Sequence, residues 1–140
     1  MRVELRTPEF EVEPRMLVPG EPVLSMALRP GWVEAGQRHS LMKKINYEAG
    51  EVGMGPRHDK VWLGAHGLEC LSLTISDRAL RAANNGISGD VELCCVQKLA
   101  DARLGALLAA VNAERVSGFP SGRLFLDSIE QAVAVALINN

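Results

Sequence analysis

The sequence predicts an α+β fold in which a small antiparallel β-barrel or sandwich is followed by a C-terminal pair of α-helices. Residues that break regular structure are unevenly spread, since ten of the 13 glycines and six of the seven prolines lie before residue 91. Short apolar segments lie between them, which is typical of strands joined by turns. After residue 101 the apolar residues recur three and four positions apart, which is typical of helices.

Five segments in the first part have the composition of strands. In one of them, alternation places Leu71 and Leu73 on one face and Cys70, Ser72 and Thr74 on the other. Because both faces of this strand carry apolar residues, it suits a barrel or sandwich in which other elements cover one side of the sheet. The expected strands are residues 22–29, 40–49, 60–65, 68–75 and 91–98. Turns are expected at the glycine-containing segments 31–37, 49–59 and 65–67.

Capping residues predict where the helices begin. Ser76 can cap a short helix near residues 77–84, which the sequence Asn84-Asn85-Gly86 would end. Asp101 can cap a second helix, which Gly118 and Pro120 would end, and Ser121 can cap a third that begins at Arg123. We therefore expect a β-sheet region over residues 1–98 and a helical pair over residues 99–140.

The helical pair has more apolar surface than one contact can cover. The last helix is apolar over most of its circumference in its second half, so it must be covered on more than one side. The sheets, the preceding helix and a second copy of the chain could each supply a cover. We expect a dimer interface at four positions of the first long helix: Leu104, Leu107, Leu108 and Val111.

Composition and charge exclude several classes of protein. The chain has 140 residues, enough for one domain with its own core, and a formal net charge of −2. No segment is electropositive, so nothing in it is suited to hold a phosphate backbone. Its longest fully apolar run, residues 132–138, is far shorter than the roughly 18 residues that span a membrane. The N-terminal residues do not form a signal peptide, and we expect a cytoplasmic domain.

Few residues suggest chemistry. The three cysteines are an odd number without a C-x-x-C pair, and we expect them to be reduced. His39, His58 and His66 are scattered, so we expect no metal and no cofactor, although histidines in loops can still meet by folding. The candidate ligand-binding residues are three of the few aromatic side chains: Trp32, Tyr47 and Trp62.

Three stretches, in order, carry a resemblance to a known family: YEAGEVGMGPRHD from Tyr47, LSLTISDRAL from Leu71, and DARLGALLAAVNAERVSGFPSGRLFLDSIEQAVAVAL from Asp101. Together they resemble the N-terminal regulatory domain of AraC-family transcription regulators. The resemblance implies a cupin-like β-barrel that senses a small effector and a helical pair that forms a homodimer. It also implies a C-terminal DNA-binding domain with two helix-turn-helix motifs, which this chain does not contain.

The expected function is therefore regulatory and not enzymatic: binding of an unidentified small effector shifts a dimer that controls DNA binding by the missing domain. The alternative is a stand-alone small cupin enzyme, an isomerase or a metal-dependent oxygenase. It would need a bound metal, or a general base such as His39 or His66. A third hypothesis is a purely structural dimerisation module with a filled barrel.

Overall fold

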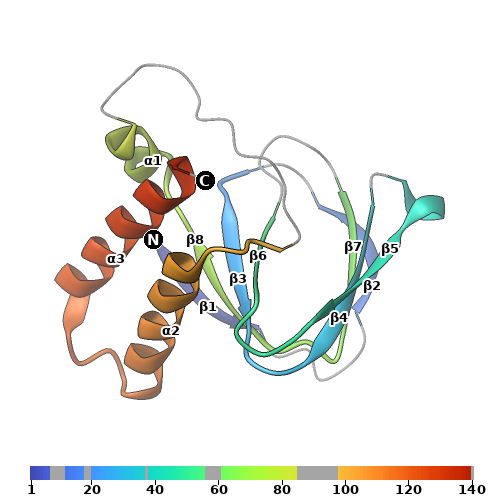
Figure 1. Ribbon diagram of the computed structural model, residues 1–140, viewed down its shortest axis with the longest axis horizontal. Helices are drawn as coiled ribbons and strands as arrows, with labels where there is room; N and C mark the ends of the chain where they lie inside the picture. The colour runs from blue at the N-terminus through green and yellow to red at the C-terminus, as the bar shows by residue number, and fades with distance from the viewer. Residues whose placement is uncertain (7–11, 18–19, 37, 56–60, 85–97, 140) are drawn as a thin grey trace.

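The computed structural model describes residues 1–6, 12–17, 20–36, 38–55, 61–84 and 98–139. Within these ranges the first part of the chain forms strands and the last part forms helices (Figure 1). The strands are β1 (Arg2–Arg6), β2 (Val12–Leu17), β3 (Val23–Ala27), β4 (Gly31–Gly36), β5 (Lys43–Tyr47), β6 (Val52–Met54), β7 (Val61–His66) and β8 (Cys70–Thr74). The helices are the short 3-10 helix η1 (His39–Leu41), α1 (Asp77–Ala83), α2 (Ala102–Val116) and α3 (Gly122–Ile138).

The strands form two four-stranded antiparallel sheets. Sheet A has the order β1-β8-β3-β6, and sheet B has the order β2-β7-β4-β5. The predicted α+β class, antiparallel strands followed by helices, is confirmed. No strand pair joins the two sheets in the described part of the chain, so a closed barrel is not present there.

Three connections cross from one sheet to the other at the same end of the molecule: residues 28–30, 48–51 and 67–69. Backbone hydrogen bonds hold these crossings side by side. The amide of Leu28 donates to the Glu69 carbonyl at 2.8 Å, and that of Gly50 donates to the Ala27 carbonyl at 2.8 Å. The two sheets therefore diverge from a common end, with one face of each directed toward the other (Figure 1).

Four of the five predicted strands are confirmed within about two or three residues at their ends. The fifth, residues 91–98, lies outside the described residues except for its last position. Two of the expected turns are wrong, because residues 31–36 form β4 and residues 52–54 form β6. The glycines at both ends of β4 serve close approach between segments: a Cβ at Gly31 would lie 2.9 Å from the His66 carbonyl oxygen, and one at Gly36 would lie 2.7 Å from that of Leu41.

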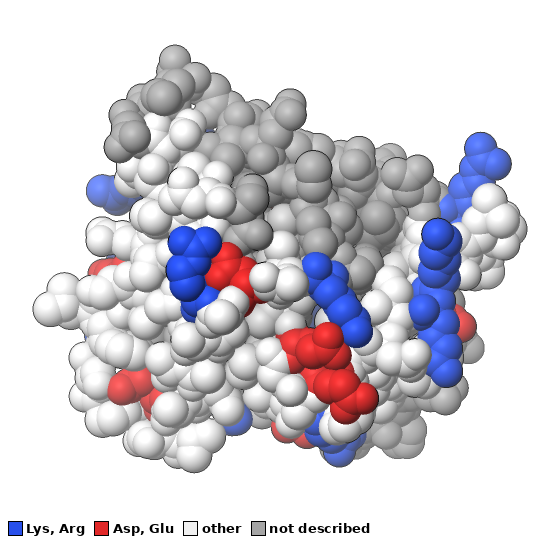
Figure 2. Space-filling view, viewed as in Figure 1, with Lys and Arg blue, Asp and Glu red and all other residues white. Residues whose placement is uncertain are grey.

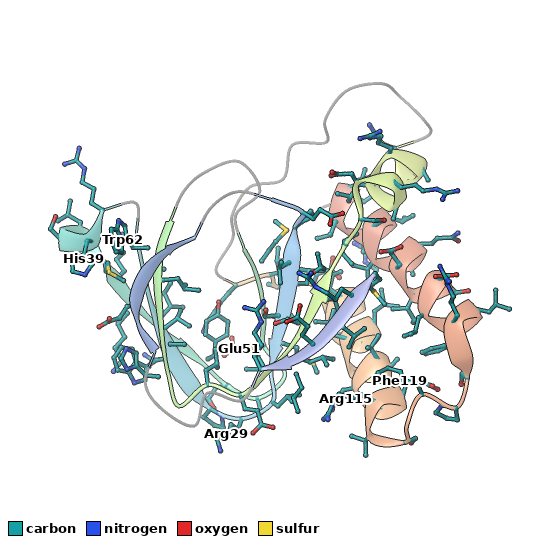
Figure 3. All side chains as sticks on the ribbon, turned by 180° about the vertical axis from the view of Figure 1, so that it is seen from behind. Arg29, His39, Glu51, Trp62, Arg115 and Phe119 are labelled. Atoms are coloured by element: carbon teal, nitrogen blue, oxygen red, sulfur yellow. The ribbon has the colours of Figure 1, made fainter. Side chains whose placement is uncertain are left out.

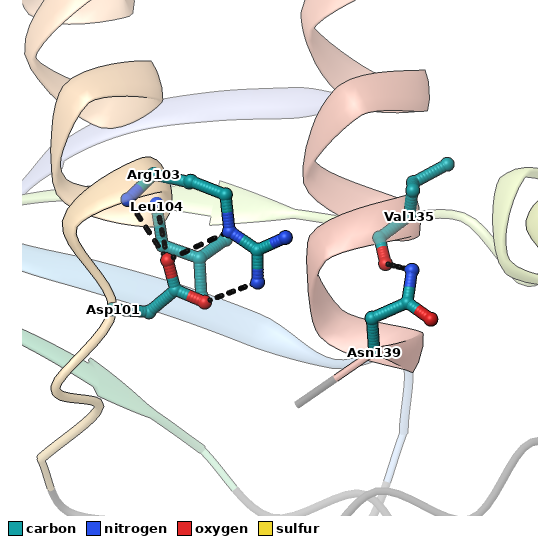
Figure 4. A network of polar contacts seen from close by, with 5 residues as sticks. All are labelled: Asp101, Arg103, Leu104, Val135 and Asn139. Atoms are coloured by element: carbon teal, nitrogen blue, oxygen red, sulfur yellow. Dashed lines mark hydrogen bonds and ion pairs between the residues drawn. The ribbon is translucent and has the colours of Figure 1, made fainter.

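Helix α2 begins as the sequence predicts. The Asp101 carboxylate accepts hydrogen bonds from the backbone amides of Arg103 at 2.8 Å and Leu104 at 3.3 Å (Figure 4). Such a cap replaces partners that the first helical amides otherwise lack. Ser76 caps α1 in the same way through the amide of Ala79, and Asn84 ends that helix.

The cap expected at the start of α3 is wrong. Ser121 makes no side-chain cap bond; its hydroxyl donates instead to Glu114 Oε1 of α2 at 2.6 Å. The turn between the two helices contains Gly118 and Phe119 at φ 82 and 57, so it bends through the left-handed region. The carboxylate of Glu114 therefore holds Ser121 and the turn against α2. Ser121 does not cap α3 with its side chain.

The main core lies between sheet A and the helices, which cover one face of that sheet (Figure 1). The inner residues of α2 and α3 are fully buried against strands β3, β6 and β8. The largest buried side chains of this layer are Leu24, Leu71, Leu73, Ile75, Leu80, Leu104, Leu108, Val111 and Val133. None of the helices described is long and apolar enough to cross a membrane.

Candidate functional site

Among the described residues, the inner faces of the two sheets meet over a second apolar cluster, which is smaller than the first. Its buried members are Ala27 of sheet A with Val33 and Tyr47 of sheet B. Partly buried side chains of sheet B and the adjoining crossing complete it: Ile45, Leu63, Ala65 and Leu68. Because Ala27 contacts this cluster, the face of β3 that carries Ala27 is the one directed toward sheet B.

Hydroxyl groups occupy the sheet A side of this intersheet site. Register pairs Ser25 with Ser72, and their Oγ atoms lie 2.8 Å apart. Ser72 is only 2% exposed, and Thr74, two residues further along β8, is also buried. Each hydroxyl offers one donor and two acceptor positions, so one mutual hydrogen bond leaves further capacity for a ligand or water. We call Ser25, Ser72 and Thr74 the hydroxyl wall.

Charged groups lie at the outer edge of this wall. Glu4 of β1 is the register partner of Ser72, and its carboxylate pairs with Arg2 at 2.6 Å and with Arg6 at 3.9 Å. These side chains are partly exposed and belong to the edge strand of sheet A. The edge is therefore charged but internally paired, whereas the wall itself is neutral.

Cys70 lies beside the hydroxyl wall without being activated. Its Sγ is 3.9 Å from Ser72 Oγ, at the limit of a weak hydrogen bond to sulfur. Burial raises the pKa of the Cys70 thiol and outweighs the opposing effect of the Ser72 hydroxyl. A thiol with a raised pKa is protonated at neutral pH, so Cys70 is suited to packing and not to nucleophilic catalysis.

The structure does not bring the three predicted ligand-binding aromatics together. Tyr47 is buried in the intersheet cluster. Trp32 alternates with Val33 along β4 and so lies on the opposite, outer face of sheet B, where Trp62 also lies. Of the three candidate ligand-binding aromatics, only Tyr47 is therefore part of the intersheet site.

Both tryptophans are covered locally on that outer face. The Trp32 ring stacks on His66 at 3.7 Å with 10° between the planes, and Lys44 Nζ lies 4.5 Å from the centre of the Trp32 ring. Trp62 packs edge to face against His39 at the end of sheet B away from Arg29 (Figure 3). Two histidines thus serve as partners for tryptophans.

One side chain connects the intersheet cluster to the start of α2. Lys98 Nζ lies 3.1 Å from Glu51 Oε2 and 5.5 Å from the centre of the Tyr47 ring. The next residue donates its backbone amide to the Val52 carbonyl of β6 at 2.8 Å. A hydrogen bond from the Glu48 backbone amide, together with Lys98, lowers the pKa of Glu51. The segment that leads into α2 is therefore held against Tyr47 and β6.

Three of the four predicted dimerisation residues are fully buried in the core of their own chain. Leu104, Leu108 and Val111 are 0% exposed and belong to the core between sheet A and the helices; Leu107 is partly buried beside them. Their burial explains their apolar character without a second copy. The exposed side of α2 carries instead five small or apolar residues spaced as one helical face: Ala102, Ala106, Ala109, Ala113 and Val116. We call this set the outer α2 face.

Charge and metal chemistry give no further site in the part of the chain that the structure describes. In the view of Figure 2, the described basic side chains are scattered and do not form one broad patch. Among the described residues, no group of three or more histidine, cysteine, aspartate or glutamate side chains could hold a metal ion. His58 lies outside those residues, and so do Cys94 and Cys95.

The sequence analysis did not identify the hydroxyl wall, although the alternation of residues along β8 indicated part of it. The alternation along β8 placed Cys70, Ser72 and Thr74 on one face. That face became a candidate only when Ser25 of β3 was placed beside Ser72. No model of a known protein family matches the chain, and its sequence matches no curated protein.

Proposed function

We propose that the chain is the effector-sensing and dimerisation domain of an AraC-type transcription regulator, acting in the cytoplasm. The observation that carries the proposal is the connection from the intersheet site to α2 through Tyr47, Lys98 and Glu51. An effector that contacts Tyr47 would meet the same residue that positions the segment entering α2. Binding and helix position are then energetically linked, as a sensor requires.

The sheets would form the cupin-like sensor. The hydroxyl wall offers polar partners, and the apolar cluster of sheet B offers a surface for carbon atoms. Sites of this composition, mostly apolar with a few convergent polar groups, suit small molecules. DNA would be bound only through a C-terminal domain outside this chain.

The dimer would form through the outer α2 face, with a second copy of the chain as the occupant. This face carries no charged residue between Arg103 and Glu114, and its alanines allow close approach of another helix. Helix α3 also exposes apolar residues, with Leu124 80% and Val135 46% exposed. A surface rich in such residues and poor in charge favours association.

Analytical ultracentrifugation of Ala109→Glu tests this interface. The change places a charge at the middle of the outer α2 face while keeping a good helix former, so a folded monomer is expected where the unchanged chain dimerises. Ala82→Glu, on the exposed side of α1, is the matched control and should leave the dimer intact. If Ala109→Glu dimerises as the unchanged chain does, the outer α2 face is not the interface.

The size of the natural protein tests the regulator itself. An antibody raised against this domain should detect a protein heavier than 15.1 kDa by about 100 residues or more, as a further DNA-binding domain requires. A band at 15.1 kDa would contradict the regulator and favour a protein that acts as this domain alone.

A further inference from the structure

Strand β5 (Lys43–Tyr47) is an open edge of sheet B. In the part of the chain that the structure describes, β4 is the only strand paired with it, and the helices lie on the other side of the molecule, against sheet A (Figure 1). Every second backbone amide and carbonyl of an edge strand points away from its neighbour and can pair with a further strand. Along residues 43–46 these groups therefore offer hydrogen bonds to an extended segment, and we call this row the β5 edge.

One lysine lies on each face of sheet B beside this edge. Lys43 and Lys44 are consecutive, so their side chains leave the strand on opposite faces, and both are exposed. Within the described residues neither ammonium group forms an ion pair, since Lys44 Nζ lies over the Trp32 ring. Glu34 is the register partner of Lys44, but its Oε2 atom lies 3.6 Å from Nε2 of His66. Both cations are therefore available to carboxylates of a partner.

The next two positions of the strand add a second requirement. Ile45 stands opposite Val33 and is only partly buried where it packs on the intersheet cluster. An apolar side chain on an added strand would cover the open side of Ile45, as cross-strand neighbours do. Asn46 stands opposite Trp32 on the other face and is exposed, so its amide suits a polar neighbour.

The lysines also decide between possible occupants of the edge. Pairing with the β5 edge of a second copy would gather four lysines on one short ribbon, and lysines on an edge strand oppose such pairing. A nucleic acid could contact the lysines, but its backbone has no donors for the carbonyl groups of the edge. An extended peptide with carboxylates satisfies both the backbone groups and the two cations.

We propose that the β5 edge binds an acidic segment of another protein, which adds to sheet B as an antiparallel strand. All strand pairs described in both sheets are antiparallel, and this pairing is the more stable one per residue. From the position opposite Asn46 to the position opposite Lys43, the added strand reads polar, apolar, acidic, acidic. The proposal goes beyond the regulator function and does not depend on it.

Three short capped peptides test the mode of binding by amide chemical shifts of the unchanged chain. The first has Thr-Val-Glu-Glu at its centre and should shift the amide signals of residues 43–46 in a saturable way. The second exchanges Thr and Val, which turns the apolar side chain away from Ile45, and should bind roughly threefold more weakly. The third keeps the first sequence but is methylated on its backbone amides, and should not bind. No saturable shift with the first peptide, or equal binding of all three, would overturn the proposal.

Charge reversal locates the site on the protein. Lys43→Glu combined with Lys44→Glu should weaken binding of the first peptide by about tenfold at low salt, because two attractive pairs become repulsive. The matched control combines Arg78→Glu with Arg81→Glu on the exposed side of α1, which changes the net charge equally and should bind as the unchanged chain does. Equal affinities of the two double variants would contradict binding at the β5 edge. All four positions are exposed, so both double variants should fold, and their melting curves check this.

Two further outcomes distinguish the other occupants. A short DNA duplex that shifts the same amides at lower concentration than the first peptide would overturn the proposal in favour of a nucleic acid. A dimer of the unchanged chain that the Lys43→Glu and Lys44→Glu double variant abolishes would do so in favour of a second copy. The proposed dimer through the outer α2 face is tested separately by Ala109→Glu, so either proposal can fail without the other.

Discussion

At Gly36 of β4, an added Cβ would lie 2.7 Å from the backbone oxygen of Leu41, and backbone atoms cannot move aside as a flexible side chain can. Gly105 of α2 is the opposite case, because nothing lies within 4 Å of its Cβ position. The two residues are identical, yet only one is required by its surroundings. Substitution by alanine should therefore have effects of opposite sign.

We expect Gly36→Ala to lower the free energy of unfolding by about 1–3 kcal/mol, the usual cost of forcing extra atoms into a packed site. Gly105→Ala should raise it by about 0.5–1 kcal/mol, because alanine loses less entropy than glycine in a helix. Urea denaturation of both variants measures the two effects. A destabilising Gly105→Ala, or a neutral Gly36→Ala, would contradict the packing described for these positions.

Cys70 makes a second prediction for a single residue. Since burial raises the pKa of its thiol and limits access, iodoacetamide should leave Cys70 unmodified in the folded protein at neutral pH and modify it after denaturation. Mass spectrometry of the peptide that contains Cys70 gives the readout. Rapid modification in the folded state would show that the inner face of β8 is open or that the thiolate is stabilised.

Among the elements, α2 depends on a cap that comes from its own sequence. Asp101→Ala removes the acceptor for two backbone amides and should cost about 1 kcal/mol of stability. Asp101→Asn keeps a good capping group while removing the charge beside Arg103, so it should lose much less. Thermal melts of the two variants compare these losses, and equal losses would mean that the ion pair matters more than the cap.

The connection into α2 should depend on pH. The pKa of Glu51 is lowered in the folded chain, so its contribution to stability is complete above the ordinary pKa of a glutamate and is lost as pH falls through the lowered value. The unchanged chain should therefore melt at a higher temperature than Glu51→Gln at pH 7, and the difference should shrink as the pH falls below the ordinary pKa of a glutamate. A constant difference across this range would exclude the Glu51 carboxylate as its cause.

The elements that the sequence predicted correctly are those specified by neighbouring residues. The caps at Ser76 and Asp101 and the spacing of apolar residues in α2 need no information from distant parts of the chain. Strand β4 was missed because Gly31 and Gly36 look like turn residues, while their real role depends on segments that approach only in the folded state.

The candidate site was predicted only in part for a related reason. Tyr47 lies in the intersheet site, but Trp32 lies on the opposite face of sheet B, because the side of a sheet on which a strand residue lies changes with every position. The hydroxyl wall needs Ser25 beside Ser72, and 47 positions separate these two serines in the sequence. No local pattern could have paired them.

At the scale of the whole fold, the two packed layers differ in apolar content among the residues that the structure describes. The layer between sheet A and the helices holds large side chains such as Leu24, Leu73 and Leu104, whereas the buried members of the intersheet cluster are Ala27, Val33 and Tyr47. Burial of large apolar side chains is a main source of stability. Among the described residues, the layer between sheet A and the helices therefore contributes more apolar burial than the contact between the two sheets.

This uneven distribution means that the molecule should open in parts and not all at once. Hydrogen exchange should be slowest for amides of β3, β8 and α2 and clearly faster for those of β4 and β5, because the described contact between the sheets buries fewer large apolar side chains than the layer under the helices. A ligand that bridges the two sheets would suppress this partial opening, so its first measurable sign would be slower exchange in sheet B, with sheet A nearly unchanged.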